Sequence, residues 1–200
     1  MGAGTETTGN TLSLTTFYLL LDPAKAQRLK KELSTVRVDN TNLLNYQQLK
    51  NLPYLVAVIS EGLRIASGVS GRLPRINPKA KMAYKSFNIP PGTSISMSIR
   101  DIHFNESLFP NAHEFRPERW LVPPHEKRAI ERYLVPFSKG PRSCVGMNLA
   151  QAELYLAIGN LFRNFEMKLY ETTQRDVSIT HDFFAPFGPA DSKGLRVMVM

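Results

Sequence analysis

The most informative stretch of this chain is a run of ten residues in its last third, Phe137-Ser138-Lys139-Gly140-Pro141-Arg142-Ser143-Cys144-Val145-Gly146. They contain Cys144, the only cysteine among the 200 residues. Arg142 brings positive charge close to the sulfur, and the amphipathic run from Leu149 to Phe162 predicts a helix that begins just beyond it; both favour the thiolate form. The stretch therefore predicts a loop that presents a thiolate to a metal. The alternative is a lone cysteine that packs as a small apolar side chain.

The spacing within this loop decides between the two interpretations. Gly140 and Gly146 let the backbone approach a flat macrocycle. All the fixed positions of the pattern F-x-x-G-x-R-x-C-x-G are present, and in this the stretch resembles the cysteine-loop signature of the cytochrome P450 family. The resemblance implies haem b (iron protoporphyrin IX) as cofactor, with Cys144 as the axial ligand of the iron. It also places Phe137, Gly140, Arg142 and Gly146 against the cofactor.

A second motif opens the chain, Ala3-Gly4-Thr5-Glu6-Thr7-Thr8. It is similar to A/G-G-x-D/E-T-T/S, the oxygen-binding groove of the family's central helix. The resemblance implies that Ala3 and Gly4 leave room for dioxygen and that Glu6 and Thr7 relay protons, work that suits groups fixed on a rigid element in a dry site. The alternative is local: the Thr7 hydroxyl bonds to the carbonyl one turn earlier, and Glu6 lies in solvent.

Two more motifs follow in the family's order. Glu61-Gly-Leu-Arg64 puts a carboxylate and a guanidinium on one helix face, which alone predicts an ordinary surface salt bridge. Together with the segment Phe115–Trp120, however, it resembles the family's buried ionic network, with Arg119 as the third member and Arg116 as the alternative. The role implied is structural.

The resemblance also assigns residues near the propionates of the haem. Arg75 falls where the family has a basic propionate contact, with Arg142 as its counterpart, and arginine binds carboxylates bidentately. The alternative for Arg75 is a solvated strand residue. His103 is a further possible propionate contact. The aromatic segment from Phe183 to Phe187 is expected to reach over the haem as part of a substrate pocket, or else to be ordinary core.

The fold class expected is mainly α with small antiparallel β-sheets, as in the C-terminal, haem-binding portion of the cytochrome P450 fold. Asp22 and Pro23 predict a helix start. Pro90-Pro91-Gly92 predicts the turn of a hairpin. Periodicity predicts helices over Pro23–Leu33, Pro53–Ala66 and Val145–Asn164, and strands over Arg72–Ile76, Lys81–Phe87, Thr93–Ile99, Glu166–Tyr170 and Leu195–Val199.

Composition narrows the function classes. A hydrophobic content of 42% suits one domain, and a single cysteine argues against a disulfide framework. The net charge of +8 comes from scattered basic residues, which does not predict nucleic-acid binding. No apolar run is long enough to cross a bilayer. Family members are more than twice as long, so residues 1–200 are expected to form a partial domain that lacks the N-terminal half, including the membrane anchor and the roof of the pocket.

The activity implied is a haem-thiolate monooxygenase that inserts one atom of O2 into a small apolar organic substrate. Without a dinucleotide-binding motif, the chain is expected to receive electrons from NADPH through a separate NADPH-cytochrome P450 reductase. Four basic residues could dock such an acidic partner. They are Lys127, Arg128, Arg132 and Lys139.

The segment Glu61–Pro78 looks most like fungal enzymes of secondary metabolism, and the full-length form is expected at the cytosolic face of the endoplasmic reticulum membrane. Two other functions remain open. One is a haem-thiolate isomerase or dehydratase, against which Glu6 and Thr7 argue. The other is a catalytically silent fragment of a monooxygenase.

Overall fold

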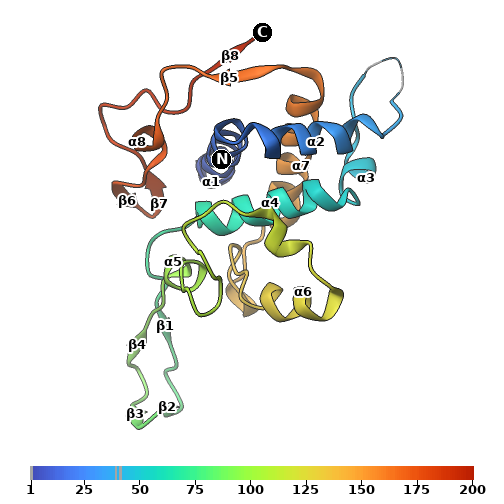
Figure 1. Cartoon of the computed structure of the whole chain (residues 1–200). Coiled ribbons are helices and arrows are strands. Elements are labelled where there is room, and N and C mark those ends of the chain that lie inside the picture. The colour runs from blue at the N-terminus through green and yellow to red at the C-terminus, as the bar shows by residue number, and fades with distance from the viewer. Residues whose placement is uncertain (1, 39, 41) are drawn as a thin grey trace.

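The structure is a computed structural model that describes residues 2–38, 40 and 42–200, and it is mainly helical with small two-stranded antiparallel sheets, as predicted (Figure 1). The α-helices are α1 Gly2–Leu21, α2 Pro23–Ser34, α3 Tyr46–Leu49, α4 Pro53–Ala66, α5 Ile99–His103, α6 Pro124–Glu131, α7 Met147–Asn164 and α8 Gln174–Val177, with short 3-10 turns η1 Pro117–Trp120 and η2 Gly140–Arg142. The strands are β1 Arg75–Ile76, β2 Met82–Tyr84, β3 Phe87–Ile89, β4 Ser94–Ile95, β5 Met167–Leu169, β6 His181–Phe183, β7 Ala185–Phe187 and β8 Val197–Val199.

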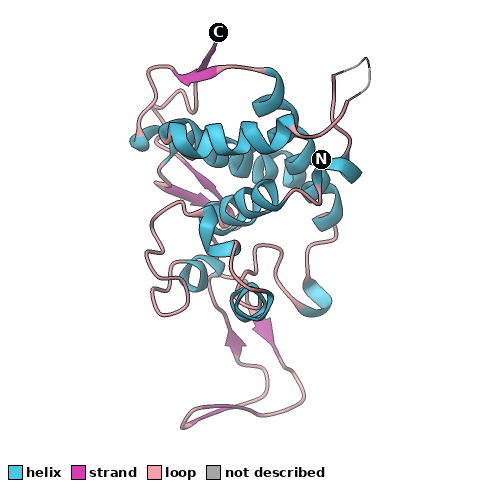
Figure 2. Cartoon of the chain, turned by 45° about the vertical axis from the view of Figure 1, so that its right-hand side comes forward, coloured by secondary structure: helices cyan, strands magenta, loops and turns pink. Residues whose placement is uncertain are grey.

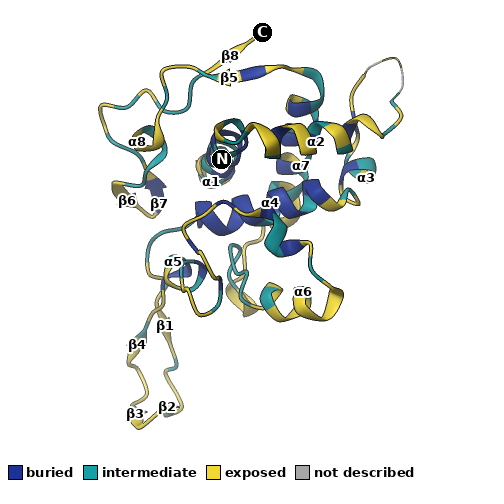
Figure 3. Ribbon diagram, in the orientation of Figure 1, coloured by how far each residue is buried: buried dark blue, intermediate teal, exposed yellow. Residues whose placement is uncertain are grey.

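The main core lies where α1, α2, α4 and α7 pack together, in the dark blue centre of Figure 3. Each helix contributes aliphatic or aromatic side chains that are removed from water, and this burial is the largest favourable term for such a body. Fully buried examples are Leu19, Leu29, Leu55, Val58, Ile158 and Phe162.

Helix α4 is buried on nearly all sides because it separates two cores. One face contributes Leu55, Val58 and Ile59 to the main core. The other contributes Ala57 to a smaller core with Phe109, Ala112 and Trp120 of the irregular segment that follows α5. Polar groups that α4 carries, such as Glu61, are therefore withdrawn from water and require partners.

The start of α2 is stabilised by a neighbouring side chain, whereas the start of α4 is stabilised by a residue of another helix. The Asp22 side chain accepts hydrogen bonds from the backbone of Ala24 and Lys25, with Pro23 at the first helical position, which confirms the predicted start of α2. Leu52 offers no such cap to α4. Instead Glu32 of α2 accepts from the backbone N–H groups of Tyr54 and Leu55, at 2.8 Å each.

The β-rich segment differs from the predicted single hairpin. The predicted strand Lys81–Phe87 is two strands, β2 and β3, joined by a turn in which Lys85 has a φ of 51°. Pro90-Pro91-Gly92 does turn the chain, but it leads from β3 to β4, which pairs with β1. The result is a nested ribbon that projects from the helical body (Figure 2). The predicted strand Thr93–Ile99 is shortened because its end begins α5, capped by Ser98.

The C-terminal segment contains one predicted sheet and one that the sequence analysis did not predict. Strands β5 and β8 pair antiparallel, which confirms the expected terminal strand pair. Strands β6 and β7 form a hairpin whose tip is Phe184, packed beside α1. Helix α7 begins at Met147, two residues later than predicted, because the preceding residues belong to the cysteine loop. No helix in the described ranges is long and apolar enough to cross a membrane.

Candidate functional site

A cavity of about 560 Å³ lies between the N-terminal part of α1 and the loop that leads into α7. It brings together segments that are far apart in the chain, including the first motif and the cysteine loop. Its walls are mostly apolar. The residues around it are Ala3, Gly4, Thr7, Thr8, Thr11, Leu63, Gly68, Val69, Leu73, Arg75, Ile99, Pro136, Phe137, Ser138, Arg142, Cys144, Val145, Gly146, Ala150, Leu154 and Phe184.

Cys144 lies on the cavity wall with its thiol free and exposed. Its backbone N–H donates to the Phe137 carbonyl at 2.9 Å, which closes the loop into a compact turn. Gly140 has a φ of +76°, a conformation that disfavours other residues, so it shapes the turn and does not line the cavity. Gly146 does line it, and a Cβ there would lie 3.9 Å from the Cys144 sulfur. The sulfur is thus presented at the start of α7.

Two arginines face the same cavity without carboxylate partners in the described part of the chain. Among the described residues, the Arg75 side chain donates only to the neighbouring Pro74 carbonyl, at 2.9 Å. The Arg142 side chain makes no hydrogen bond or ion pair with other described residues. Guanidinium groups that border an apolar cavity and lack protein anions are suited to the anionic groups of a ligand.

The opposite wall of the cavity is the first part of α1, where Ala3 and Gly4 have little or no side chain to project into the cavity. The Thr7 hydroxyl donates to the Ala3 carbonyl at 2.8 Å, the local bond considered as an alternative to a relay. Glu6 is exposed and does not line the cavity. The structure therefore brings Ala3, Gly4 and Thr7 to Cys144 and leaves Glu6 on the solvent side of α1.

The threonines of α1 form a row that the sequence analysis did not single out beyond Thr7. Thr11 donates to the Thr7 carbonyl at 2.9 Å, and Thr15 to the Thr11 carbonyl at 2.7 Å. Thr8 is different: it lines the cavity, it is 7% exposed, and its hydroxyl has no partner among the described residues. A buried hydroxyl left unpaired is costly, so Thr8 indicates a cavity that a ligand or water occupies.

Behind the cavity, Glu61 and Arg64 of α4 form a fully buried ion pair. The Arg64 guanidinium meets both carboxylate oxygens, with Nη2–Oε1 at 2.8 Å and Nε–Oε2 at 3.0 Å. Arg119 adds a third charge, with its Nε 3.0 Å from Glu61 Oε1. Arg116 contributes only its backbone N–H, so of the two arginines considered, Arg119 is the one whose side chain joins the network.

The other side-chain nitrogen atoms of this network also have acceptors, which the motif alone does not reveal. Arg64 also donates to the backbone carbonyls of His103, Ala112 and Glu114. The Trp120 indole N–H donates to Glu61 Oε2 at 2.9 Å. A buried ionic set is tolerated only when it is satisfied in this way. The network therefore ties α4 to the irregular segment in front of the cysteine loop.

The suggestion that His103 contacts a propionate is wrong. Its ring is fully buried and does not line the cavity. Nδ1 lies 3.0 Å from the Arg64 carbonyl, and Nε2 accepts from the Val135 N–H at 2.9 Å, which together require the neutral ring. Desolvation lowers the pKa of His103 to about 4. The residue links the end of α4 to the chain just before Pro136 and Phe137, and no sequence signal beyond its position indicated this.

Of the three phenylalanines expected over the cavity, the structure places one there. Phe184, at the tip of the β6–β7 hairpin, lines the cavity. Phe183 stacks on His181, with ring centroids 5.9 Å apart, and Phe187 packs edge-on against Phe183. The latter two border a separate surface hollow.

The cytochrome P450 family model matches residues 1–190, nearly the whole chain. The chain belongs to the cytochrome P450 family. Its P450 relatives include a cytochrome P450 monooxygenase of Ascocoryne sarcoides, 45% identical over 99% of this chain, and the monooxygenase sdnE of Sordaria araneosa, 42% identical over 100%. The N-acetyltryptophan 6-hydroxylase ivoC of Emericella nidulans is 42% identical, also over 100%. The chain spans 39% of the length of each of these three proteins.

P450 membership implies haem, and the cavity offers what that group requires. A macrocycle requires apolar walls, its iron a soft or nitrogenous ligand, and its propionates positive charge. The cavity supplies an exposed thiol at Cys144 and two guanidinium groups without protein partners in the described residues, at Arg75 and Arg142. The donor set therefore fits an iron porphyrin.

Proposed function

We propose that the protein of which this chain forms part is a haem-thiolate monooxygenase that acts on a small apolar organic substrate. One observation carries the proposal: a single apolar cavity has the Cys144 thiol on one wall and the small residues Ala3 and Gly4 on the other. Haem held by a cysteine thiolate supplies activation of dioxygen and transfer of one oxygen atom. P450 relatives that are named as a monooxygenase and a hydroxylase support the reaction class.

In this mechanism the chain first binds and orients haem b. Cys144 would supply the sulfur ligand of the iron, helped by its place just before the positive N-terminal end of α7. Arg75 and Arg142 would hold the propionates by charge-assisted hydrogen bonds. Phe137 and Gly146 would form the wall beside the macrocycle and exclude water from the sulfur.

The remaining steps assigned to the chain are proton movements. Thr7 lies on the cavity side of α1 and its hydroxyl oxygen keeps acceptor capacity while donating to the Ala3 carbonyl. Glu6, on the solvent side of the same helix turn, would collect protons and pass them inward through Thr7. Gly4 leaves space for dioxygen beside Thr7.

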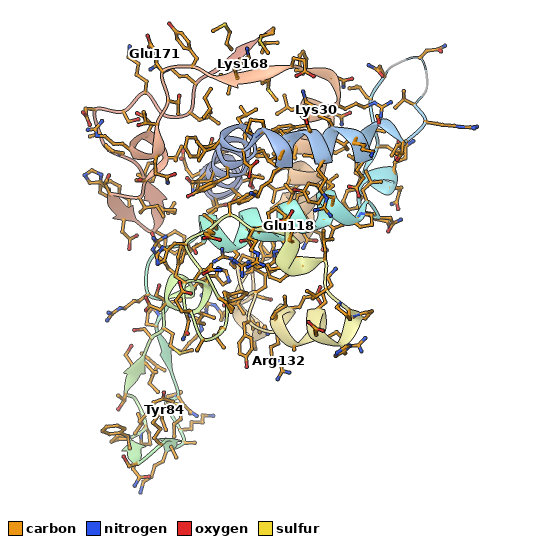
Figure 4. All side chains as sticks on the ribbon, in the orientation of Figure 1. Lys30, Tyr84, Glu118, Arg132, Lys168 and Glu171 are labelled. Carbon is orange, nitrogen blue, oxygen red and sulfur yellow. The ribbon has the colours of Figure 1, made fainter. Side chains whose placement is uncertain are left out.

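Electrons would come from NADPH through a separate NADPH-cytochrome P450 reductase. The proposed docking residues differ in their freedom to bind an acidic partner. Lys127 lies 3.7 Å from Glu131, Lys139 donates to the Arg132 carbonyl, and Arg132 lies at the end of α6 on the surface (Figure 4). The full-length protein is proposed to act at the cytosolic face of the endoplasmic reticulum membrane.

The test is the spectrum of the reduced, carbon-monoxide-bound chain expressed with haem supply. We expect the Soret band characteristic of thiolate ligation, and we expect Cys144→Ser to abolish it. Persistence of the band in the variant would end the ligand assignment. Failure of the wild-type chain to retain haem would favour a second candidate, a catalytically silent fragment. The observation behind this candidate is that the chain spans 39% of the length of its relative from Ascocoryne sarcoides. A haem-thiolate isomerase or dehydratase would retain the band yet turn over substrate without consuming dioxygen.

A further inference from the structure

Phe184 is held at the cavity in a conformation that its own residue type disfavours. Its φ is 77°, in the left-handed region that phenylalanine rarely adopts. Phe184 is 60% exposed and yet lines the cavity, which places it at the opening of the cavity in this chain. Such a conformation persists only where surrounding contacts impose it.

Three hydrogen bonds from two segments impose it here. The Phe184 N–H donates to Asp182 Oδ1 at 2.9 Å, and the Phe184 carbonyl accepts from the Ser70 N–H at 3.2 Å. The Ser70 hydroxyl closes the ring by donating to the same Asp182 oxygen at 2.9 Å. Both backbone polar groups of Phe184 are thus engaged, one by its own hairpin and one by the loop that follows α4.

We propose that Asp182 and Ser70 form a latch that fixes the Phe184 ring at the cavity opening and thereby limits the width of the apolar ligands that enter. The apolar nature of the ligand rests on the proposed function, whereas the latch itself rests on the three hydrogen bonds. Ser70 and Asp182 do not line the cavity, so they are positioning residues that act through Phe184.

The chain offers a matched control in the same C-terminal segment. Asp191 forms an exposed ion pair with Arg175, with Nη2–oxygen distances of 2.7 Å, and neither residue lines the cavity or contacts Phe184. Asp191→Ala removes a carboxylate of equal charge, while Asp182→Asn keeps an acceptor oxygen at the latch. Asp191→Ala therefore reports the effect of losing a negative charge elsewhere in the segment, and Asp182→Asn the effect of losing the charge while the hydrogen-bond acceptor stays in place.

The first readout is amide hydrogen exchange of residues 183–185, which requires no haem. Loss of two hydrogen bonds should raise exchange there by about tenfold in Asp182→Ala. We expect a smaller rise in Ser70→Ala, wild-type exchange in Asp191→Ala, and near wild-type exchange in Asp182→Asn. Wild-type exchange in Asp182→Ala would overturn the latch.

The second readout is the affinity of the haem-loaded chain for imidazole against the wider 4-phenylimidazole, both followed by the Soret shift. Phe184→Ala measures the effect of removing the ring, and we expect it to favour the wider probe. Asp182→Ala should shift the affinity ratio in the same direction by about fivefold, in line with the loss of a hydrogen bond, and Asp182→Asn should restore it. An unchanged ratio in Asp182→Ala, despite faster exchange, would overturn width selection. Loss of haem in every variant and in the wild type would instead count against the proposed function and leave hydrogen exchange to decide the latch.

Discussion

At the scale of single residues, the Glu61 carboxylate shows how a weak sequence signal becomes a strong structural one. Its oxygens accept from the side chains of Arg64, Arg119 and Trp120 and from the backbone of Arg116. The carboxylate is fully buried, so these bonds operate away from water. Removal of its charge leaves two guanidinium groups without a counter-ion in a place where solvation cannot replace it.

We expect Glu61→Gln to lower the free energy of unfolding by roughly 3–5 kcal/mol, as for other buried pairs that lose one partner. Urea unfolding measures this. The control is Glu131→Gln, which breaks an exposed pair with Lys127 at 3.7 Å and should cost less than about 0.5 kcal/mol. Equal losses in the two variants would contradict the structural role of the network.

A second residue-scale prediction concerns acid stability. His103 has a pKa of about 4 when folded, against 6.5 for the ordinary side chain, because burial disfavours the cation. As the pH falls, His103 therefore binds a proton in the unfolded chain before it does so in the folded chain. The stability that the neutral His103 contributes is fully present above pH 6.5 and is lost as the pH drops toward about 4. The loss should reach roughly 3 kcal/mol.

Unfolding free energies at intervals between pH 7 and pH 5 measure this loss, since most carboxylates titrate below that range. His103→Gln should flatten the slope, because glutamine carries no titrating group. His125→Gln is the control, since His125 is an exposed residue of α6 and should leave the slope unchanged. A slope in His103→Gln equal to that of the wild type would show that another group causes it.

At the scale of elements, local patterns predicted the helices well and the β segments poorly. Asp22, Pro23 and Pro53 carry start signals that act within one turn, so α2 and α4 begin where predicted. The β2–β3 turn at Lys85 carries no glycine or asparagine, and Lys85 adopts a left-handed conformation that sequence rules do not anticipate. Similarly, the cap of α4 comes from Glu32, a residue of another helix.

The same distinction applies to the site. The cysteine loop and the α1 motif could be predicted because the residues of each motif are contiguous in the sequence. The structure places most of these residues around one cavity. The partners of Arg64, the link made by His103 and the unpaired hydroxyl of Thr8 depend on how distant segments pack. A periodic pattern reports only on neighbouring residues, so it cannot predict contacts between residues that are far apart in the sequence.

Glu32 provides a test of this tertiary cap. It accepts from two N–H groups at the start of α4, which has no side-chain cap of its own. Glu32→Ala should therefore cost about 1–2 kcal/mol of unfolding free energy, in the range of other helix caps. Glu32→Gln should recover part of this loss, because an amide oxygen still accepts one bond. Thermal unfolding of both variants gives the comparison, and no loss in Glu32→Ala would exclude the cap.

The crossing of α1 and α4 is a second element-scale test. A Cβ on Gly62 would lie 2.1 Å from Thr15 Oγ1, closer than atoms can approach. Gly62→Ala should thus destabilise by about 1–3 kcal/mol, despite the better helix propensity of alanine. Gly9→Ala in α1 meets nothing within 4 Å and should stabilise by up to about 1 kcal/mol. Adding Thr15→Ala to Gly62→Ala should relieve the clash, and a double-mutant cycle measures this coupling.

At the scale of the whole molecule, the cavity lies where four stretches that are distant in the sequence meet. The α1 motif, the end of α4, the cysteine loop and the β6–β7 tip each contribute walls. A ligand that fills this space would therefore connect all four parts. The Thr8 hydroxyl, which has no partner among the described residues, and the apolar lining both favour the binding of a ligand in this cavity.

Haem should consequently raise the thermal midpoint of the chain. Free haem at a hundred times its dissociation constant would contribute about 2.7 kcal/mol. Calorimetry of the wild type with and without haem measures the shift, which should shrink in Cys144→Ser and in Arg142→Ala. A shift of equal size in all three would mean that haem binds elsewhere.

The nested ribbon of β1 to β4 has a practical consequence. Its outer end, near Tyr84, extends away from the helices (Figure 4), and four of the six residues of β2 and β3 are exposed while the other two are half-buried. The turn at Lys85 and Ser86 can therefore accept an inserted peptide, such as an epitope or a fluorophore-labelling sequence, without disturbing the cavity. It offers a handle for immobilising or tracking the protein through a site remote from its chemistry.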